Sequence, residues 1–119
     1  MNTKEKVKEF ALSLAQAAYD KKGIDIMIYD MEGVSSLADY FMFITANNKK
    51  QAQAIADELD DKGAEEGLIL KHMEGYREGG WVLLDFGDIV CHIFTEEDRS
   101  FYGLETLWND AKELPFKGK

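Results

Sequence analysis

The chain has 119 residues, 45% of them hydrophobic and 31% charged, which is enough for one hydrophobic core and leaves a second domain without one. Lys and Arg total 14 against 23 Asp and Glu, and the formal charge of -9 disfavours direct binding to bare nucleic acid. A single cysteine excludes an internal disulfide, and no stretch approaches the roughly 18 to 20 apolar residues of a membrane span. We therefore expect one domain over residues 1–119, in the cytoplasm and off the membrane. The acidic charge fits a basic protein partner and a merely soluble surface equally well.

The N-terminal segment has the pattern of an amphipathic helix over residues 4–22. Thr3 is suited to cap its start, and Gly23 to end it. Its apolar side chains recur at helical spacing, and they are Val7, Phe10, Ala11, Leu14 and Ala18. Such an apolar stripe must be buried, and we expect it to pack on a β-sheet.

Two strands are expected next, over residues 25–30 and 40–45, with a turn after the first at Met31-Glu32-Gly33. They are expected to be neighbours in the sheet. Asn47 or Asn48 then caps a second helix. Its apolar face is formed by Ala52, Ile55, Ala56 and Leu59, before Gly63 and Gly67 end it.

Residues 68–74 read as a strand, followed by a turn at residues 75–80. Residues 81–86 and 89–94 read as an antiparallel hairpin joined by Gly87-Asp88, and the second of its strands is apolar on both faces, which favours a central position.

After residue 95 the pattern becomes helical until Pro115. We expect one broken helix or two short ones. The apolar side would be formed by Phe101, Leu104, Leu107, Trp108 and Ala111. The whole order predicts an α/β (α+β) domain with a single-layer mixed β-sheet of about five strands covered by helices.

The residues that carry most enzyme chemistry are scarce in this sequence. Cys91 and His92 are neighbours on a predicted strand and so point to opposite faces, which favours a core cysteine and a hydrogen-bonded histidine over a metal site. No serine lies in a nucleophile elbow, and no glycine-rich loop leads into a helix. Asp85 and Asp88 flank a turn, where aspartates often bond the turn backbone. We expect no catalytic residue, metal or cofactor, and hence a binding protein.

Large aromatic side chains gather in the last third of the chain: Trp81, Phe94, Phe101, Tyr102 and Trp108. Such residues are common in binding hot spots and in cores. Phe94 and Phe101 are expected in the core. Trp81 shares a strand face with Leu83 and Asp85, and the acid on that face argues that it is not wholly buried.

Two long strings make the sequence similar to a known family. W-V-L-L-D-F-G-D-I-V-C-H-I-F at residues 81–94 and R-S-F-Y-G-L-E-T-L-W-N-D-A at residues 99–111 resemble the ribosomal silencing factor family, also called RsfS or Iojap. The likeness continues upstream through residues 32–41 and 53–57. It implies a nucleotidyltransferase-like topology without that activity. It also implies binding to the large ribosomal subunit through large-subunit ribosomal protein fourteen, which blocks joining of the small subunit and represses translation under nutrient limitation.

Carried over by position, the resemblance implies a ribosome-facing surface of five residues: Trp81, Asp85, Phe86, Tyr102 and Glu105. Trp81 would be the apolar anchor, and Asp85 or Glu105 the partner of a basic side chain. Leu107 and Trp108 would hold the last helix on the sheet.

The chain departs from the family pattern at four positions. Glycine, serine and arginine are frequent where it has Ala46, Asn48 and Lys50, and valine where it has Cys91. The first three leave open what the start of the second helix does.

Two other functions stay open beside ribosome binding. One is a residual nucleotidyl- or phosphotransferase of the same fold, and the other is a self-associating scaffold, since exposed aromatic residues also suit a homodimer. The N-terminus lacks an arginine- and serine-rich leader, which favours a bacterial cytoplasm over import into an organelle.

Overall fold

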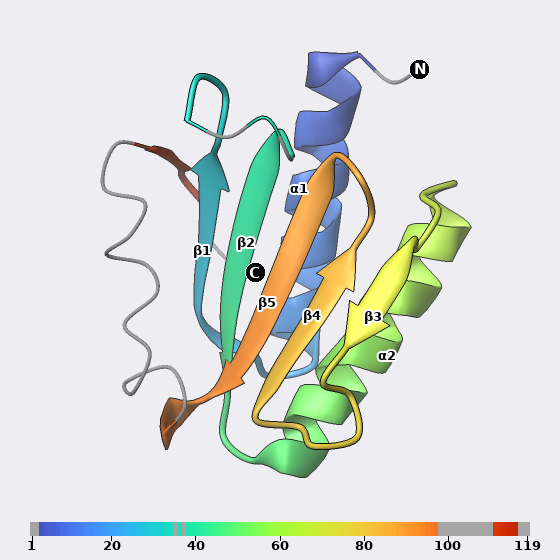
Figure 1. Cartoon of the computed structure of the whole chain (residues 1–119), viewed down its shortest axis with the longest axis vertical. Coiled ribbons are helices and arrows are strands. Elements are labelled where there is room, and N and C mark those ends of the chain that lie inside the picture. Colours follow the sequence, from blue (N-terminus) through green and yellow to red (C-terminus); the bar gives the residue numbers. More distant parts are fainter. Residues whose placement is uncertain (1–2, 35, 37, 98–110, 117–119) are drawn as a thin grey trace.

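The computed structural model of the chain describes residues 3–34, 36, 38–97 and 111–116. Two helices and six strands lie in these ranges (Figure 1). In chain order they are α1 (Lys4–Asp20), β1 (Ile24–Asp30), β2 (Tyr40–Ala46), α2 (Lys49–Glu65), β3 (His72–Glu74), β4 (Trp81–Asp85), β5 (Ile89–Thr95) and β6 (Lys112–Leu114).

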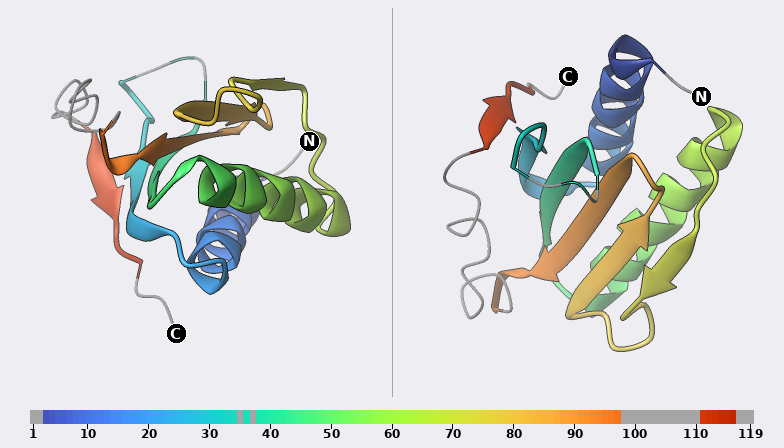
Figure 2. Two further views of the ribbon diagram at one scale, coloured as in Figure 1. Left: turned by 90° about the horizontal axis from the view of Figure 1, so that it is seen from below. Right: turned by 45° about the horizontal axis from the view of Figure 1, so that its top comes forward.

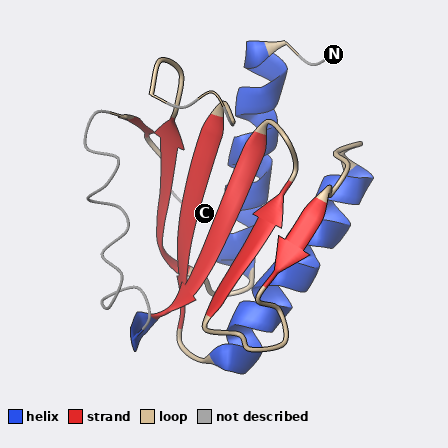
Figure 3. Ribbon diagram, viewed as in Figure 1, coloured by secondary structure: helices blue, strands red, loops and turns tan. Residues whose placement is uncertain are grey.

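The six strands form one mixed sheet in the order β3-β4-β5-β2-β1-β6 (Figure 3). β2 and β5 are parallel, and every other neighbouring pair is antiparallel. Three predictions are confirmed: β1 and β2 are neighbours, β4 and β5 form a hairpin, and the apolar β5 is central. The mixed α+β class is also confirmed, with six strands in place of about five.

Both described helices pack on the same face of the sheet (Figure 2). Their caps are those predicted, because the Thr3 side chain accepts a hydrogen bond from the Lys6 amide at 3.2 Å and Asn48 accepts one from the Gln51 amide at 2.9 Å. The core beneath them joins the apolar stripes of both helices to alternate residues of the strands. Its fully buried large side chains include Leu14, Ile28, Met42, Ile44, Ile55, Leu59, Leu84, Ile89 and Ile93.

The strand predicted over residues 68–74 is wrong in its first half. Only His72–Glu74 pairs with β4. Gly67 has a φ of 88°, and the Leu68 amide bonds back to the Gly63 carbonyl at 2.7 Å, so these residues close helix α2 instead of extending the sheet. The buried Leu68 side chain belongs to this helix ending.

The prediction that the chain is helical from residue 96 until Pro115 is wrong for Lys112–Leu114, because these residues form strand β6. They pair antiparallel with β1, with Leu114 opposite Ile28 and Lys112 opposite Asp30. A strand of three residues carries too little pattern to be distinguished from a helix end, and the unpaired backbone of β1 decides its structure. The other residues of that predicted helix, Phe101, Leu104, Leu107 and Trp108, lie outside the described ranges. Neither described helix is long and apolar enough to span a membrane.

Candidate protein-binding face

The face of the sheet opposite the helices carries a second, aromatic cluster. Because side chains alternate along a strand, residues that do not point toward α1 and α2 point to this side. We call it the aromatic face, and its rings are those of Tyr29, Phe41, Phe43, Trp81, His92 and Phe94. Phe43 and Phe94 are each 1% exposed, so part of this face is core as well as surface.

His92 lies at the centre of the aromatic face. Its ring stacks on Phe43 at a centroid distance of 5.1 Å and on Phe94 at 6.2 Å. Its Nδ1 accepts a hydrogen bond of 3.2 Å from Nε1 of Trp81, so the proton of the neutral imidazole is on Nε2. Among the described residues Nε2 has no partner. Burial lowers the pKa of His92 to about 4, which keeps the ring neutral at pH 7.

Trp81 lies partly in the core and partly at the surface. It is half-buried, and its indole packs on Phe94 at a centroid distance of 5.2 Å while its N–H is bonded to His92. The expectation that the strand face of Trp81 is not wholly buried is therefore confirmed. The polar group of the indole is used in a hydrogen bond inside the protein.

Leu83 and Asp85 follow Trp81 on the same side of β4, as predicted, since β4 alternates between half-buried and buried residues. On the neighbouring strand β3, Glu74 pairs with Leu83 and His72 pairs with Asp85. Cross-strand partners share a face. We call these five residues, His72, Glu74, Trp81, Leu83 and Asp85, the edge patch. It combines an indole, a leucine and two carboxylates, with His72 Nε2 3.2 Å from Oε1 of Glu74.

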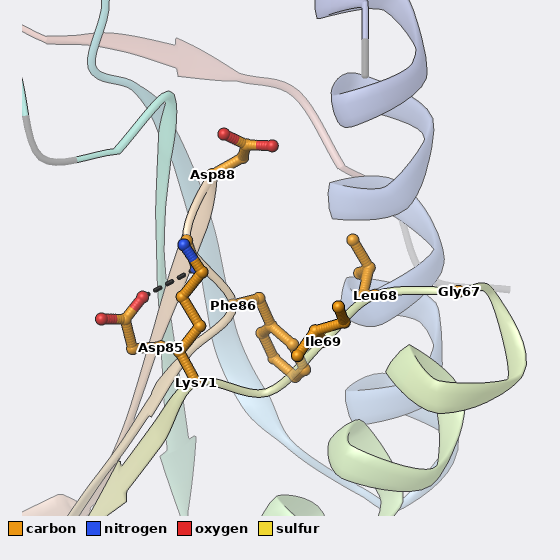
Figure 4. Close-up of a pocket in the computed structure, with 8 residues that line it drawn as sticks. Gly67, Leu68, Ile69, Lys71, Asp85, Phe86 and Asp88 are labelled. Carbon is orange, nitrogen blue, oxygen red and sulfur yellow. Dashed lines mark hydrogen bonds between the residues drawn. The ribbon is translucent and has the colours of Figure 1, made fainter. Parts of the chain in front are cut away.

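Asp85 also holds the turn that follows it. Its Oδ1 accepts a hydrogen bond of 2.7 Å from the amide of Gly87, whose φ of 89° suits glycine (Figure 4). This agrees with the turn role considered for the aspartate. An open depression of about 480 Å³ lies beside the turn, and Lys71, Ile69 and Asp88 are among the residues that line it.

Phe86 does not lie on the surface where it was expected. Its side chain is 5% exposed and belongs to the core under the helices. Figure 4 shows Phe86 and Asp85 on opposite sides of the strand. A Cβ added to Gly63 would lie 2.7 Å from Cε1 of Phe86, so the ring fills the space that this glycine leaves in α2. Phe86 thus joins the turn to α2 and offers little surface to a partner.

The described residues bring no catalytic constellation together. Cys91 is fully buried on the helix side, and burial raises the pKa of its thiol to about 12, so it is a core residue as predicted. Within the described ranges no group of three or more His, Cys, Asp or Glu could hold a metal ion. Tyr102 and Glu105, also expected in the site, lie outside those ranges.

Sequence reasoning missed the part that Phe41, Phe43 and His92 play in supporting Trp81. The signal was present, because Phe41 and Phe43 alternate with core residues and Phe43 pairs directly with His92. A strand buried on both faces shows no polar alternation, so the two faces could not be separated without knowing the pairing.

Comparison with known proteins identifies the family. A family model described as "Ribosomal silencing factor during starvation" matches residues 4–118. The ribosomal silencing factor RsfS of Bacillus subtilis is 50% identical over 97 residues, which cover 82% of each chain. The chloroplast protein Iojap of Zea mays is 38% identical over 110 residues, covering 90% of this chain and 47% of that protein. The family model and the Bacillus subtilis protein are named as silencing factors and not as enzymes, in agreement with the prediction that the chain is not an enzyme.

A solved structure supports the same conclusion. The crystal structure of a protein from Bacillus halodurans superposes with a TM-score of 0.82 at 37% identity, covering 92% of this chain and 99% of that one. The family match spans both hairpin strands, β4 and β5, and the edge patch. The chain belongs to the ribosomal silencing factor family.

Proposed function

We propose that the chain binds the large ribosomal subunit through large-subunit ribosomal protein fourteen, blocks joining of the small subunit, and so represses translation under nutrient limitation in the cytoplasm. Membership of the ribosomal silencing factor family is the observation that carries this proposal. The mechanism is steric. A folded domain that occupies a contact between the subunits shifts the joining equilibrium by mass action, and it needs no bond-making chemistry.

The edge patch is the part of the described surface that best fits a basic protein partner. Trp81 and Leu83 supply apolar area. Glu74 places a carboxylate beside Leu83 on β3, and Asp85 places another two residues further along β4. Charged groups at the rim of an apolar centre steer association and fix orientation. We assign contact roles to Trp81 and Asp85, and Tyr102 and Glu105 remain proposed contacts.

Phe86 acts differently in this proposal. Because its ring is buried against α2, it holds the turn that carries Asp85 and does not itself meet the partner. The net charge of -9 supports a basic protein target, and it also makes association depend on salt.

Sedimentation of ribosomal subunits tests the proposal directly. Purified Bacillus subtilis subunits are mixed at a Mg²⁺ concentration that joins about half of them, and the chain is added in excess. We expect joined ribosomes to decrease, free subunits to increase, and the chain to travel with the large subunit. An unchanged joined fraction at saturating chain would rule the function out.

A matched pair of variants tests the surface. Leu83→Arg places a positive charge in the edge patch, whereas Val34→Arg makes the same change at a residue that is 39% exposed in the loop after β1. We expect Leu83→Arg to weaken binding to the large subunit and Val34→Arg to bind like the parent. Equal binding by both variants would remove the edge patch from the interface while leaving the function standing.

A further inference from the structure

Four lysines gather at one end of this acidic protein, where α1 ends and α2 begins. They are Lys21, Lys22, Lys49 and Lys50, and we call them the basic corner. All four are exposed. They hold four of the 14 basic residues of a chain whose net charge is -9. The corner is therefore a local exception to the charge of the molecule.

Gln51 joins the two halves of the basic corner. Its Nε2 donates to the carbonyls of Lys21 at 3.4 Å and Lys22 at 3.1 Å, and its Oε1 accepts from the Asn47 amide. The two lysine pairs, about 30 residues apart in sequence, are thus held together by one side chain. The fold therefore fixes the two lysine pairs next to each other, although they come from different parts of the chain.

The two lysines of α2 oppose the charge preference of their own helix. A helix N-terminus carries partial positive charge and favours acids, yet the first turn of α2 has Lys49 and Lys50 and no acidic residue. The carboxylates of the helix lie in its second half instead, where the dipole disfavours them; they are Asp57, Glu58, Asp60, Asp61 and Glu65. The helix dipole gains nothing from this distribution of charge, which favours a role for the lysines outside the fold.

Contacts inside the protein leave the lysine charges largely available. Lys21 Nζ is 3.9 Å from a carboxylate oxygen of Glu58, at the limit of an ion pair, and the lysine side chain is 51% exposed. The other three lysines have no ion pair within the described ranges. The stem of Lys49 runs over Gly79, where an added Cβ would meet it, so the stem is supported while the charge stays at the surface.

We infer that the basic corner binds the phosphate backbone of ribosomal RNA on the large subunit. The inference rests on the proposed function, because it needs a ribosomal surface beside the edge patch. β4 and α2 both begin at the lower end of the molecule in Figure 1, so the start of the edge patch and the basic corner lie toward the same end. The four ammonium groups and the N-terminus of α2 suit a row of phosphates without reading base sequence.

Charge-reversed variants and the salt dependence of binding test this inference. Lys49→Glu with Lys50→Glu alters the corner, and Lys6→Glu with Lys8→Glu makes the same change of net charge at exposed positions of the opposite half of α1. Affinity for purified Bacillus subtilis large subunits is measured from about 50 to 200 mM salt. We expect the corner variant to bind roughly tenfold more weakly, and its plot of log affinity against log salt to be shallower by about 1 to 2.

Hydroxyl-radical cleavage of the ribosomal RNA identifies the partner. The parent and the Lys6/Lys8 variant should protect one stretch of RNA backbone, and the Lys49/Lys50 variant should lose that protection. Unchanged affinity and slope in the corner variant would overturn the inference and leave the proposed function intact. A weakened variant whose RNA protection is unchanged would overturn it in favour of an acidic protein partner. Failure of the parent chain to bind large subunits would overturn both proposals.

Discussion

Nε1 of Trp81 donates a 3.2 Å hydrogen bond to Nδ1 of His92, from β4 to the neighbouring β5. The bond joins Trp81, the largest side chain of the edge patch, to a buried imidazole. Phe43 and Phe94 hold that imidazole by stacking on it. It needs His92 to be neutral, because a protonated Nδ1 has no lone pair to accept. The geometry of the surface therefore depends on a group whose protonation is set by the core.

The first prediction concerns the pH dependence of stability. The pKa of His92 is about 4 when folded, against 6.5 for the free side chain, so the unfolded chain binds more protons between these values. The free energy of unfolding should therefore decrease as pH falls through this window, by about 2 kcal/mol between pH 7 and pH 5 from this group alone. Urea unfolding at pH 7, 6 and 5 measures it.

His92→Asn is the matched control. Its side-chain oxygen keeps an acceptor near Nδ1 for the Trp81 N–H but does not titrate. The variant should be less stable at pH 7, because it leaves unfilled space among the rings, yet it should lose less free energy on going to pH 5. The prediction is wrong if parent and variant lose the same amount.

The second prediction isolates the hydrogen bond itself. Trp81→Phe keeps an aromatic ring on Phe94 but removes the N–H and leaves Nδ1 of His92 without this donor. We expect a loss of roughly 1 to 2 kcal/mol in the free energy of unfolding. The same change made in a His92→Phe background should cost less, because the acceptor is already gone. A double-mutant cycle with zero coupling would show that the bond contributes nothing.

The third prediction separates the charge of Asp85 from its role in the turn. Asp85→Asn removes the charge and keeps an oxygen that can accept from the Gly87 amide, so the fold should be retained. Affinity for the large subunit should fall several-fold if Asp85 meets a basic side chain. Asp61→Asn, at an exposed position of α2, is the matched control for net charge and should bind like the parent. Equal affinities would assign Asp85 to the turn alone.

Most of the fold could be predicted from the sequence, because most of its helices and strands depend on residues that lie close together in the chain. Thr3 and Asn48 cap the helices through bonds to residues three positions away, and Cys91 and His92 take opposite faces because a strand alternates. β6 could not be found in this way, since its three residues are a strand only because β1 has an edge to pair with. Phe86 is a different case, because its surface role came from the family resemblance, whereas strand alternation after Asp85 places its side chain on the helix side.

Gly63 and Phe86 supply the last prediction, which tests the packing that the sequence did not reveal. In an exposed helix, Gly→Ala would stabilise by about 1 kcal/mol. At Gly63 the new methyl group would lie 2.7 Å from Cε1 of Phe86, and overpacking a filled core costs about 1 to 3 kcal/mol. Because Phe86 is enclosed in the core, we expect the cost to exceed the gain, and Gly63→Ala to lower the midpoint of urea unfolding.

A second substitution shows whether the clash is the cause. Phe86→Leu shortens the side chain that meets the new methyl group, so Gly63→Ala should be less costly, or stabilising, when made in the Phe86→Leu background. If Gly63→Ala costs the same in both backgrounds, the contact between residues 63 and 86 is not what holds the turn to α2. Phe86→Leu alone should lower stability and leave the affinity of the folded protein for the large subunit within about twofold, since a 5% exposed ring has little surface to lose.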